Sequence, residues 1–210
     1  MLKRVFESLG NPAAAQQVRR FLNVGGGSKQ VPIPGHYAGW QHVLLDVNPA
    51  GSADIVLDAR KLRELPGAQF DAVYCSHNLE HYYIHEVPGV LAGFAHVLTL
   101  HGFLELRVPD LAAVMREAIR RNLDVEDALY SSPAGPISVR DVLYGFGAEI
   151  GRGNEFYAHK TGFTARSLRR ILAEAGFDHV FALAEMGGFE LRLAAFRGAP
   201  GANERGLLKV

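Results

Sequence analysis

Short apolar runs separated by polar or glycine-rich breaks recur along the chain, at lengths typical of buried β-strands. Each of the first five runs is stopped by a polar residue, a glycine or a proline. This pattern predicts strands over residues 21–24, 43–47, 54–58, 70–75 and 103–108. Two further runs, over residues 179–185 and 190–197, predict two closing strands joined by a tight turn at Gly187 and Gly188.

The stretches between the later strands have the helical period instead, with apolar residues at i, i+3, i+4, i+7 and i+8. This spacing predicts helices over residues 87–98, 111–119 and 168–175. Asp110 stands where it would cap the second of them. The third is predicted to be capped by Thr164 and ended by Gly176.

Two segments have neither period. Between the first two strands, Pro32 and Pro34 interrupt any helical pattern and predict an irregular loop. Residues 123–160 contain a Pro- and Gly-rich stretch and one short helical pattern between Val139 and Leu143. We interpret this second segment as an insertion that covers a site.

This order of elements predicts an α/β fold, a doubly wound, mainly parallel, seven-stranded Rossmann-like sheet whose last strand is antiparallel. The whole chain, residues 1–210, is predicted to form a single domain that carries the insertion at residues 123–160. In such a sheet, ligands bind beyond the carboxyl ends of the strands, where the winding reverses. Candidate functional residues are therefore sought at the strand ends.

Composition and charge narrow the classes of partner. Lys plus Arg and Asp plus Glu both number 22, so no overall field attracts nucleic acid or an anionic membrane. Cys75 is the only cysteine, so no internal disulfide is expected, and no apolar run approaches the roughly 18 residues of a membrane span. Residues 1–7 lack the apolar stretch of a secretory signal. We expect a cytoplasmic protein with a small-molecule partner, and the oligomeric state stays open.

The first predicted strand runs into three consecutive glycines, Gly25, Gly26 and Gly27. Glycines there allow a tight turn and a close approach of the backbone to a ligand, although an ordinary turn has the same sequence. Asp46 ends the second strand about twenty residues later, where its carboxylate can accept hydrogen bonds from both hydroxyls of a ribose. Together the glycines and Asp46 indicate a nucleoside ligand.

The residues after the glycines favour a nucleoside without phosphates. A dinucleotide site needs G-x-G-x-x-G at the start of a helix, because the helix N-terminus binds the pyrophosphate. Here Gln30 occupies the position of the third glycine, and Pro32 and Pro34 oppose a helix. S-adenosylmethionine carries no phosphate, and an irregular loop can satisfy its sulfonium, amino and carboxylate groups. A dinucleotide-dependent oxidoreductase is therefore the less favoured alternative.

These motifs resemble those of the class I S-adenosylmethionine-dependent methyltransferases, with a similarity that covers residues 21–180. Residues 23–27 resemble the first motif of that family, residues 44–49 the second, and residues 58–60 the segment whose acidic residue lies near the adenine. Residues 70–81 resemble the fourth-strand motif and its His-x-Leu-Glu-His-like turn, the most specific match. The resemblance implies S-adenosylmethionine as cofactor, bound by Asn23, Gly25, Gly26, Gly27, Asp46, Val47, Asp58, Ala59, Ser76 and His77.

Two positions depart from the family pattern. Asn23 replaces the usual acidic residue before the glycines, and Lys29 stands near a position where a further glycine is expected. The amide carbonyl of an asparagine can still accept a hydrogen bond from the cofactor's amino group. These departures keep open an alternative function, a methyltransferase-like binding or scaffold protein without catalysis.

The predicted activity is methyl transfer to an unidentified acceptor, expected to be a small molecule. The enzyme must mainly hold the acceptor atom in line with the methyl group, and a base helps only where the acceptor starts protonated. We select His81 and His159 as candidate catalytic residues because histidine titrates near neutrality. The plain alternatives are that His81 ties down its loop and that His159 lies in a surface loop. Several aromatic residues could form an apolar lid over an acceptor, and ordinary packing under the insertion explains them equally well: Tyr82, Tyr83, Tyr144, Phe146, Phe156, Tyr157 and Phe163.

Residues 77–81, with the sequence His-Asn-Leu-Glu-His, also match H-x-x-E-H, a zinc-binding motif when it lies on a helix. Here His77 follows directly on a predicted strand, and only His85 or Glu86 offers an obvious third ligand nearby. The sequence therefore leads us to assign no metal ligands.

Overall fold

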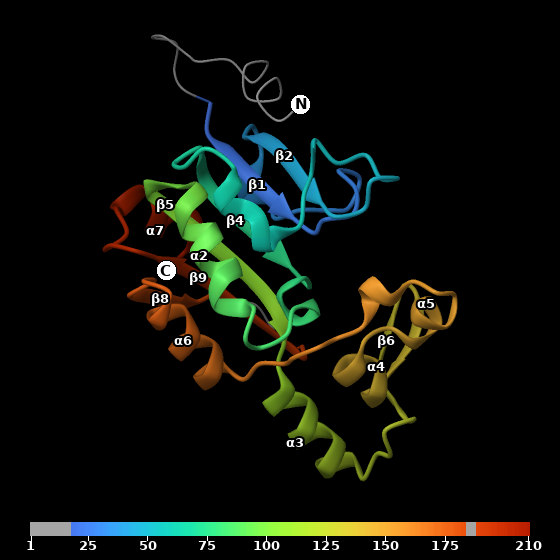
Figure 1. Ribbon diagram of the computed structural model, residues 1–210. Coiled ribbons are helices and arrows are strands. Elements are labelled where there is room, and N and C mark those ends of the chain that lie inside the picture. The colour runs from blue at the N-terminus through green and yellow to red at the C-terminus, as the bar shows by residue number, and fades with distance from the viewer. Residues whose placement is uncertain (1–17, 184–187) are drawn as a thin grey trace.

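The computed structural model describes residues 18–183 and 188–210. At its centre is a seven-stranded sheet in the order β3-β2-β1-β4-β5-β9-β8 (Figure 1). The strands are β1 (Arg20–Val24), β2 (Gln41–Asp46), β3 (Ile55–Val56), β4 (Phe70–Ser76), β5 (Leu98–Pro109), β8 (His179–Ala182) and β9 (Glu190–Phe196). The pairs from β3 to β5 are parallel, whereas β9 is antiparallel to both of its neighbours, β5 and β8. The predicted doubly wound, mainly parallel sheet with an antiparallel last strand is confirmed.

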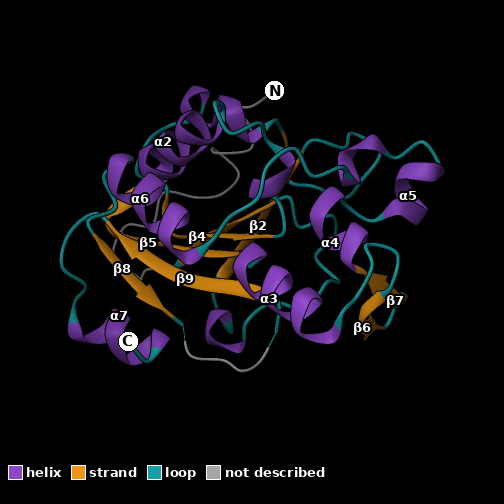
Figure 2. Ribbon diagram, turned by 90° about the horizontal axis from the view of Figure 1, so that it is seen from below, coloured by secondary structure: helices purple, strands orange, loops and turns teal. Residues whose placement is uncertain are grey.

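Helices cover the two faces of the sheet unequally (Figure 2). On one face α2 (Val87–Val97), α6 (Ala165–Glu174) and the 3₁₀-helix η2 (Ala59–Glu64) enclose the larger hydrophobic core. On the other face the loop after β1 and the helix α7 (Ala202–Leu208) cover a smaller, aromatic-rich core. Other helical elements are α3 (Leu111–Arg121), α4 (Val139–Tyr144), α5 (Gly147–Gly151), η1 (Gly35–Tyr37), η3 (Leu79–His81) and η4 (Glu155–Tyr157).

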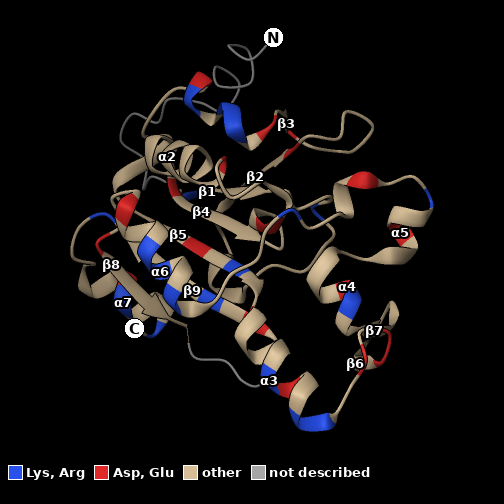
Figure 3. Ribbon diagram, turned by 60° about the horizontal axis from the view of Figure 1, so that its bottom comes forward, with Lys and Arg blue, Asp and Glu red and all other residues tan. Residues whose placement is uncertain are grey.

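Helix α6 begins where the sequence predicts, because Thr164 and Ser167 form a capping box. The Ser167 amide donates to the Thr164 hydroxyl at 3.3 Å, and the Thr164 amide donates to the Ser167 hydroxyl at 2.9 Å. Both basic and acidic residues occur along this helix (Figure 3). Arg170 pairs with Glu174 one turn later, at 2.8 Å.

The loop after β1 is irregular, as Pro32 and Pro34 predict. Between residues 25 and 40, all of which the structure describes, the only helical element is the single turn of η1. Tyr37 at the end of this turn is buried, and its ring stacks on Phe21 of β1 with centroids 4.3 Å apart. The loop therefore takes the place of a crossover helix on this face of the sheet.

A buried carboxylate, Glu105 of β5, fastens this loop to the sheet. Glu105 faces the smaller core and has 0% of its surface exposed. Its Oε2 accepts hydrogen bonds from the Tyr37 hydroxyl and from Nε2 of His36, both at 2.9 Å. Nη2 of Arg107 lies 3.3 Å from its other oxygen. Donors on the loop after β1 and on β5 thus bind the same buried carboxylate.

Residues 123–160 fold as a β-hairpin followed by short helices (Figure 1). Strands β6 (Ala128–Ser132) and β7 (Gly135–Ser138) pair antiparallel. Helix α4 spans the short helical pattern noted in the sequence, and Ser138 and Asp141 form its capping box. The hairpin was not predicted because Leu129 is the only buried residue in its two strands, so no apolar alternation marks it.

The structure differs from the sequence prediction at three further places. β5 begins at Leu98, directly after α2, rather than at Phe103. β3 has only the two residues Ile55–Val56. The strand expected over residues 179–185 is found as β8, and the last two residues of that range lie outside the described residues. Within the described residues, no helix is both long and apolar enough to cross a membrane.

The C-terminal residues form α7, a helix that the sequence pattern does not predict. Leu208 is 7% exposed and joins the smaller core. We expect Leu208→Ala to lower the free energy of unfolding by about 2 kcal/mol, because the side chain leaves a cavity. Urea unfolding measures this, with Leu100→Ala as the control. Leu100 is 74% exposed, so its truncation should cost less than about 0.5 kcal/mol. Equal effects of the two substitutions would show that α7 does not dock on the sheet.

Candidate binding and catalytic site

The glycine turn after β1 requires glycine at its first position. Gly25 has φ +71°, and a Cβ atom there would lie 2.1 Å from Nδ2 of Asn78. The Gly25 amide donates to the Leu45 carbonyl at 2.8 Å, which ties the turn to the end of β2. Gly27 also has a positive φ, +64°, but a Cβ there would meet open space. The turn therefore has a close approach of the backbone to the Asn78 side chain at Gly25 and a left-handed residue facing open space at Gly27.

Asp46, the last residue of β2, binds the other end of the same turn, at Gly27. One carboxylate oxygen accepts the Gly27 amide at 3.0 Å, and the other accepts the Asn48 amide at 2.9 Å. Each oxygen of a carboxylate can accept two hydrogen bonds, so both retain acceptor capacity. The two strand ends thus place a fixed carboxylate beside the glycines.

A cavity of about 320 Å³ opens at these strand ends, and we call it the glycine-turn cavity. Its lining combines strand ends with residues of the insertion: Gly25, Gly27, Asp46, Val47, Asn48, Asp58, Arg60, His77, Asn78, His81, Tyr82, Glu86, Asn154, Phe156, Tyr157 and Lys160. Six of the ten predicted cofactor-binding residues lie here: Gly25, Gly27, Asp46, Val47, Asp58 and His77.

The carboxylate of Asp58 faces a guanidinium rather than open space. Asp58 caps η2, and its oxygens accept three hydrogen bonds from the Arg60 side chain, at 2.5 to 3.0 Å. Burial raises the pKa of Asp58, but the hydrogen bonds from Arg60 outweigh it and hold the pKa below its usual value. Arg60 also donates to Glu86 at 2.6 Å. The wall of the cavity here is a charged cluster of one cation and two anions.

The other four predicted cofactor-binding residues do not line the cavity. Asn23 is 2% exposed, and its Nδ2 lies 3.1 Å from Nε2 of His42, behind the glycine turn. Gly26 packs against this asparagine, since a Cβ there would lie 2.4 Å from Nδ2. Ala59 is the buried first residue of η2, and Ser76 is partly buried at the end of β4. These four residues pack at the strand ends without lining the cavity.

A second cavity, of about 500 Å³, lies between the insertion and the start of β9, and we call it the insertion cavity. Its lining is His77, His81, Pro109, Tyr130, Ala134, Ile137, Asp141, Val142, Phe146, Tyr157, His159, Gly188, Phe189, Glu190 and Arg192. Phe146 and Tyr157 thus lie over this cavity, whereas Phe163 belongs to the larger core. The hairpin and α4 supply most of the apolar wall.

His77, His81 and Tyr157 line both cavities, so the two spaces meet at these three residues. His77 lies between two carboxylates, with Nε2 2.7 Å from Glu190 and Nδ1 3.4 Å from Glu80. Burial favours the neutral ring, but Glu190 and Glu80 raise the pKa of His77 to about 9. Glu190 also accepts a hydrogen bond from Arg192. The junction therefore carries a cationic imidazole held by acidic neighbours.

The two candidate catalytic histidines lie side by side, with ring centroids 5.0 Å apart. Nδ1 of His81 lies 3.1 Å from the Ala158 carbonyl, and Nδ1 of His159 lies 3.0 Å from the Val142 carbonyl. A carbonyl can only accept, so each Nδ1 carries a proton and each neutral ring keeps its Nε2 as an acceptor. Burial lowers the pKa of His159, which favours its neutral form. In its neutral form, each ring can therefore act as a base through Nε2.

Several lining residues were not selected from the sequence. Arg60 lies at the cavity through its ion pair with Asp58, Glu86 pairs in turn with Arg60, and Asn78 lies against Gly25. Asp141 lies within the short helical pattern seen in the sequence between Val139 and Leu143. Its place in the insertion cavity depends on how the insertion folds back. The nearness of His159 to His81, across 78 positions of chain, likewise has no local sequence signal.

The chain has the class I fold of S-adenosylmethionine (SAM) dependent methyltransferases. No protein-family model matches it, and no curated protein matches it. A solved structure described as a SAM dependent methyltransferase from Archaeoglobus fulgidus is similar over 92% of this chain and 90% of that chain, with a TM-score of 0.51 and 16% identity. The PH0226 protein from Pyrococcus horikoshii OT3 is similar over 93% of this chain and 87% of that chain, with a TM-score of 0.56 and 14% identity.

The fold by itself does not specify one activity. A structure described as putative Zn-dependent alcohol dehydrogenases from Rhodobacter sphaeroides is similar over 87% of this chain and 85% of that chain, with a TM-score of 0.54 and 12% identity. In other matched structures, which include the CurJ carbon methyltransferase, this chain spans about half of the longer protein. At these identities the likeness establishes the fold, and the activity has to follow from the site.

Proposed function

We propose that the protein binds SAM in the glycine-turn cavity and transfers its methyl group to a small molecule in the insertion cavity. The observation that carries the proposal is the meeting of the two cavities at His77, His81 and Tyr157. A methyl transferase needs two such adjoining spaces, because the acceptor atom has to approach the methyl carbon in line with the breaking carbon–sulfur bond.

The residues of the glycine-turn cavity fit the adenosyl part of SAM. Asp46 offers free acceptor positions on both oxygens, which suit the two hydroxyls of a ribose. The bare Cα atoms of Gly25 and Gly27 allow a ligand to approach the backbone. Val47 and the segment at Asp58 line the same cavity and would flank the adenine. Its volume of about 320 Å³ is within the range of ligand pockets.

The connection between β1 and β2 favours SAM over a dinucleotide as the cofactor. A dinucleotide relies on a helix N-terminus after the glycines to bind its pyrophosphate. In this chain the glycines run into a loop whose only helical element is η1, a single turn at Gly35–Tyr37. The name of the Archaeoglobus fulgidus protein, a SAM dependent methyltransferase of the same fold, agrees with this choice.

Bound SAM supplies an electrophilic methyl group on a sulfonium, and the protein's part is positioning and proton removal. Tyr157 and Phe146 would cover the acceptor and exclude water from it. His81 and His159 both line the insertion cavity and donate to carbonyls through Nδ1, so the Nε2 of either ring is placed to accept the proton that a hydroxyl or amine acceptor loses. His77, which holds its proton near neutral pH, is suited to stabilise negative charge instead.

The insertion cavity favours an acceptor with an apolar body and one polar end. Its walls include Tyr130, Ile137 and Phe189, whereas Glu190 and Arg192 lie along one side. At about 500 Å³ it is large enough for a small metabolite.

Isothermal titration of the full chain with SAM and with S-adenosylhomocysteine tests the cofactor assignment. We expect one site for each ligand. No heat with either ligand would contradict the proposal. Binding of both ligands without turnover on a panel of hydroxyl, amine and thiol acceptors would favour the alternative, a binding or scaffold protein. The burial of Asn23 against His42 supports that alternative, because it leaves no acidic residue at this position to bind the ligand's amino group.

We expect Gly25→Ala to weaken S-adenosylhomocysteine binding by more than about tenfold. The new Cβ would collide with Asn78 at a residue with φ +71°, and a left-handed non-glycine residue costs about 1–2 kcal/mol by itself. The matched control is Gly89→Ala in α2, where a Cβ meets open space. Titration of both variants should show wild-type affinity only for the control. Wild-type affinity in Gly25→Ala would place the ligand elsewhere.

A further inference from the structure

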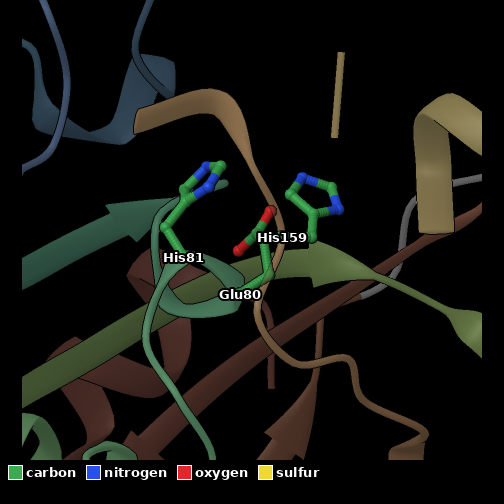
Figure 4. Close-up of side chains that lie close together, drawn as sticks. All are labelled: Glu80, His81 and His159. Carbon is green, nitrogen blue, oxygen red and sulfur yellow. The ribbon is translucent and has the colours of Figure 1, made fainter. Parts of the chain in front are cut away.

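We propose that Glu80, His81 and His159 form a binding site for one divalent transition-metal ion of the zinc type. Each residue offers one ligand atom, and these atoms all lie within 4.8 Å of one another. Figure 4 shows the Glu80 carboxylate between the two imidazole rings, with all three side chains pointing toward one another. Donor atoms around a bound zinc ion are about 3.4 Å apart, so binding would draw the three together by about 1 Å.

The backbone holds the three side chains together across the length of the insertion. The amides of Lys160 and Thr161 donate to the Glu80 carbonyl, at 2.8 and 3.2 Å. The His159 amide donates to the carbonyl of Tyr144, at 3.1 Å. These bonds anchor the end of the insertion on η3, so the nearness of His159 to Glu80 is built into the fold.

Both histidines present the nitrogen that a metal needs. Their Nδ1 atoms donate to the carbonyls of Ala158 and Val142, which leaves each Nε2 with a free lone pair. Metal-binding histidines in proteins almost always donate their other ring nitrogen in this way, and the bond fixes both tautomer and ring orientation. The supporting contacts of a metal site are therefore already present.

The burial of the Glu80 carboxylate without hydrogen-bond donors in the described part of the chain indicates that this group binds a ligand. Glu80 is 1% exposed, and among the described residues neither of its oxygens has a hydrogen-bond donor. The cation nearest to it in the ion pairs of the structure is His77, at 3.4 Å, whose Nε2 is bound to Glu190. A buried carboxylate whose nearest cation is an imidazole 3.4 Å away is only partly compensated, and a divalent cation next to it would lower the remaining cost.

The donor set selects the class of ion. Two imidazole nitrogens and one carboxylate oxygen suit zinc, cobalt and iron, whereas magnesium and calcium prefer oxygen ligands throughout. Three protein ligands leave at least one coordination position open. His81 and His159 line the insertion cavity, so that position would open toward the proposed acceptor.

This site differs from the zinc motif in the sequence. Of the H-x-x-E-H residues only Glu80 and His81 take part, because His77 is turned to Glu190. The third ligand is His159, rather than the nearby His85 or Glu86 that the sequence offers. A bound ion would occupy the two Nε2 atoms proposed above as proton acceptors, so the two roles exclude one another while a metal is bound. The metal itself can be measured without cofactor or acceptor.

Titration of the EDTA-treated full chain with Co²⁺ and Zn²⁺ tests the site. We expect one equivalent of Co²⁺ to give visible d–d bands, and Zn²⁺ to displace it. Glu80→Gln and His159→Ala should each weaken Zn²⁺ binding at least about 100-fold. The matched control is His85→Asn, on the same loop and exposed, which should bind as the wild type does.

Histidine ring NMR of the wild type gives a reading that does not depend on any variant folding. We expect Zn²⁺ to shift the Nε2 signals of two histidines, and circular dichroism to show which variants are folded. No saturable Co²⁺ or Zn²⁺ binding by the wild type would overturn the proposal. So would unchanged affinity in folded His159→Ala, or a loss in His85→Asn equal to that in His159→Ala.

Discussion

Asp46→Ala is expected to weaken S-adenosylhomocysteine binding at least about 100-fold. In the proposed complex the carboxylate accepts hydrogen bonds from both ribose hydroxyls, and hydrogen bonds to a charged group contribute about 1.5–3 kcal/mol each. Loss of about 3 kcal/mol corresponds to about a hundredfold in affinity. The same carboxylate positions the Gly27 and Asn48 amides, so the substitution also loosens the glycine turn.

Two further variants make this result interpretable. Asp178→Ala removes an exposed carboxylate from the loop after α6 and should leave binding unchanged. Asp46→Asn keeps the shape of the side chain and one acceptor oxygen, so we expect a smaller loss, about tenfold. Titration calorimetry measures all three affinities, and thermal unfolding checks that each variant is folded. Full binding by folded Asp46→Ala would exclude the proposed cofactor site.

Glu105→Ala is expected to lower the free energy of unfolding by about 3–5 kcal/mol, as removal of one partner of a buried charge network does. The substitution leaves the Tyr37 hydroxyl and the His36 ring, both bonded to the carboxylate at 2.9 Å, without their acceptor. It also removes the carboxylate next to Arg107, whose buried Nε already has no hydrogen-bond partner among the described residues. The loop over the smaller core then loses its attachment to β5.

Urea unfolding measures this effect, with Glu126→Ala as the control. Glu126 is 73% exposed in its side chain and pairs with Arg140 on the surface, so its loss should cost less than about 1 kcal/mol. If Glu105→Ala were as mild as the control, the buried network would not be what holds the loop to the sheet.

The sheet was predictable because its strands are buried and bounded by strong stop signals. The apolar run before Gly25 and the run before Asn48 each correspond to a strand, β1 and β2. Pro32 and Pro34 exclude a crossover helix on steric grounds, and the loop is irregular. By contrast, the β6–β7 hairpin buries only Leu129, and α7 is fixed by the packing of Leu208 against distant strands. Periodicity carries no signal for such elements.

The candidate site was predictable where it follows a strand end and not where it depends on the insertion. Gly25, Asp46 and Asp58 line the glycine-turn cavity because parallel strands end at one edge of the sheet. Arg60 reaches the same cavity through its pairing with Asp58, which no spacing rule predicts. His159 meets Glu80 only because the insertion folds back onto η3.

A crystal structure of the full chain with S-adenosylhomocysteine would locate both the ribose and the sulfur, and so would test the proposed cofactor site and its junction with the insertion cavity together. We expect the ribose hydroxyls within hydrogen-bond distance of Asp46, and the sulfur at the junction of the two cavities, beside His77, His81 and Tyr157. A ligand bound outside the glycine-turn cavity, or no ligand density there at saturating concentration, would contradict this expectation.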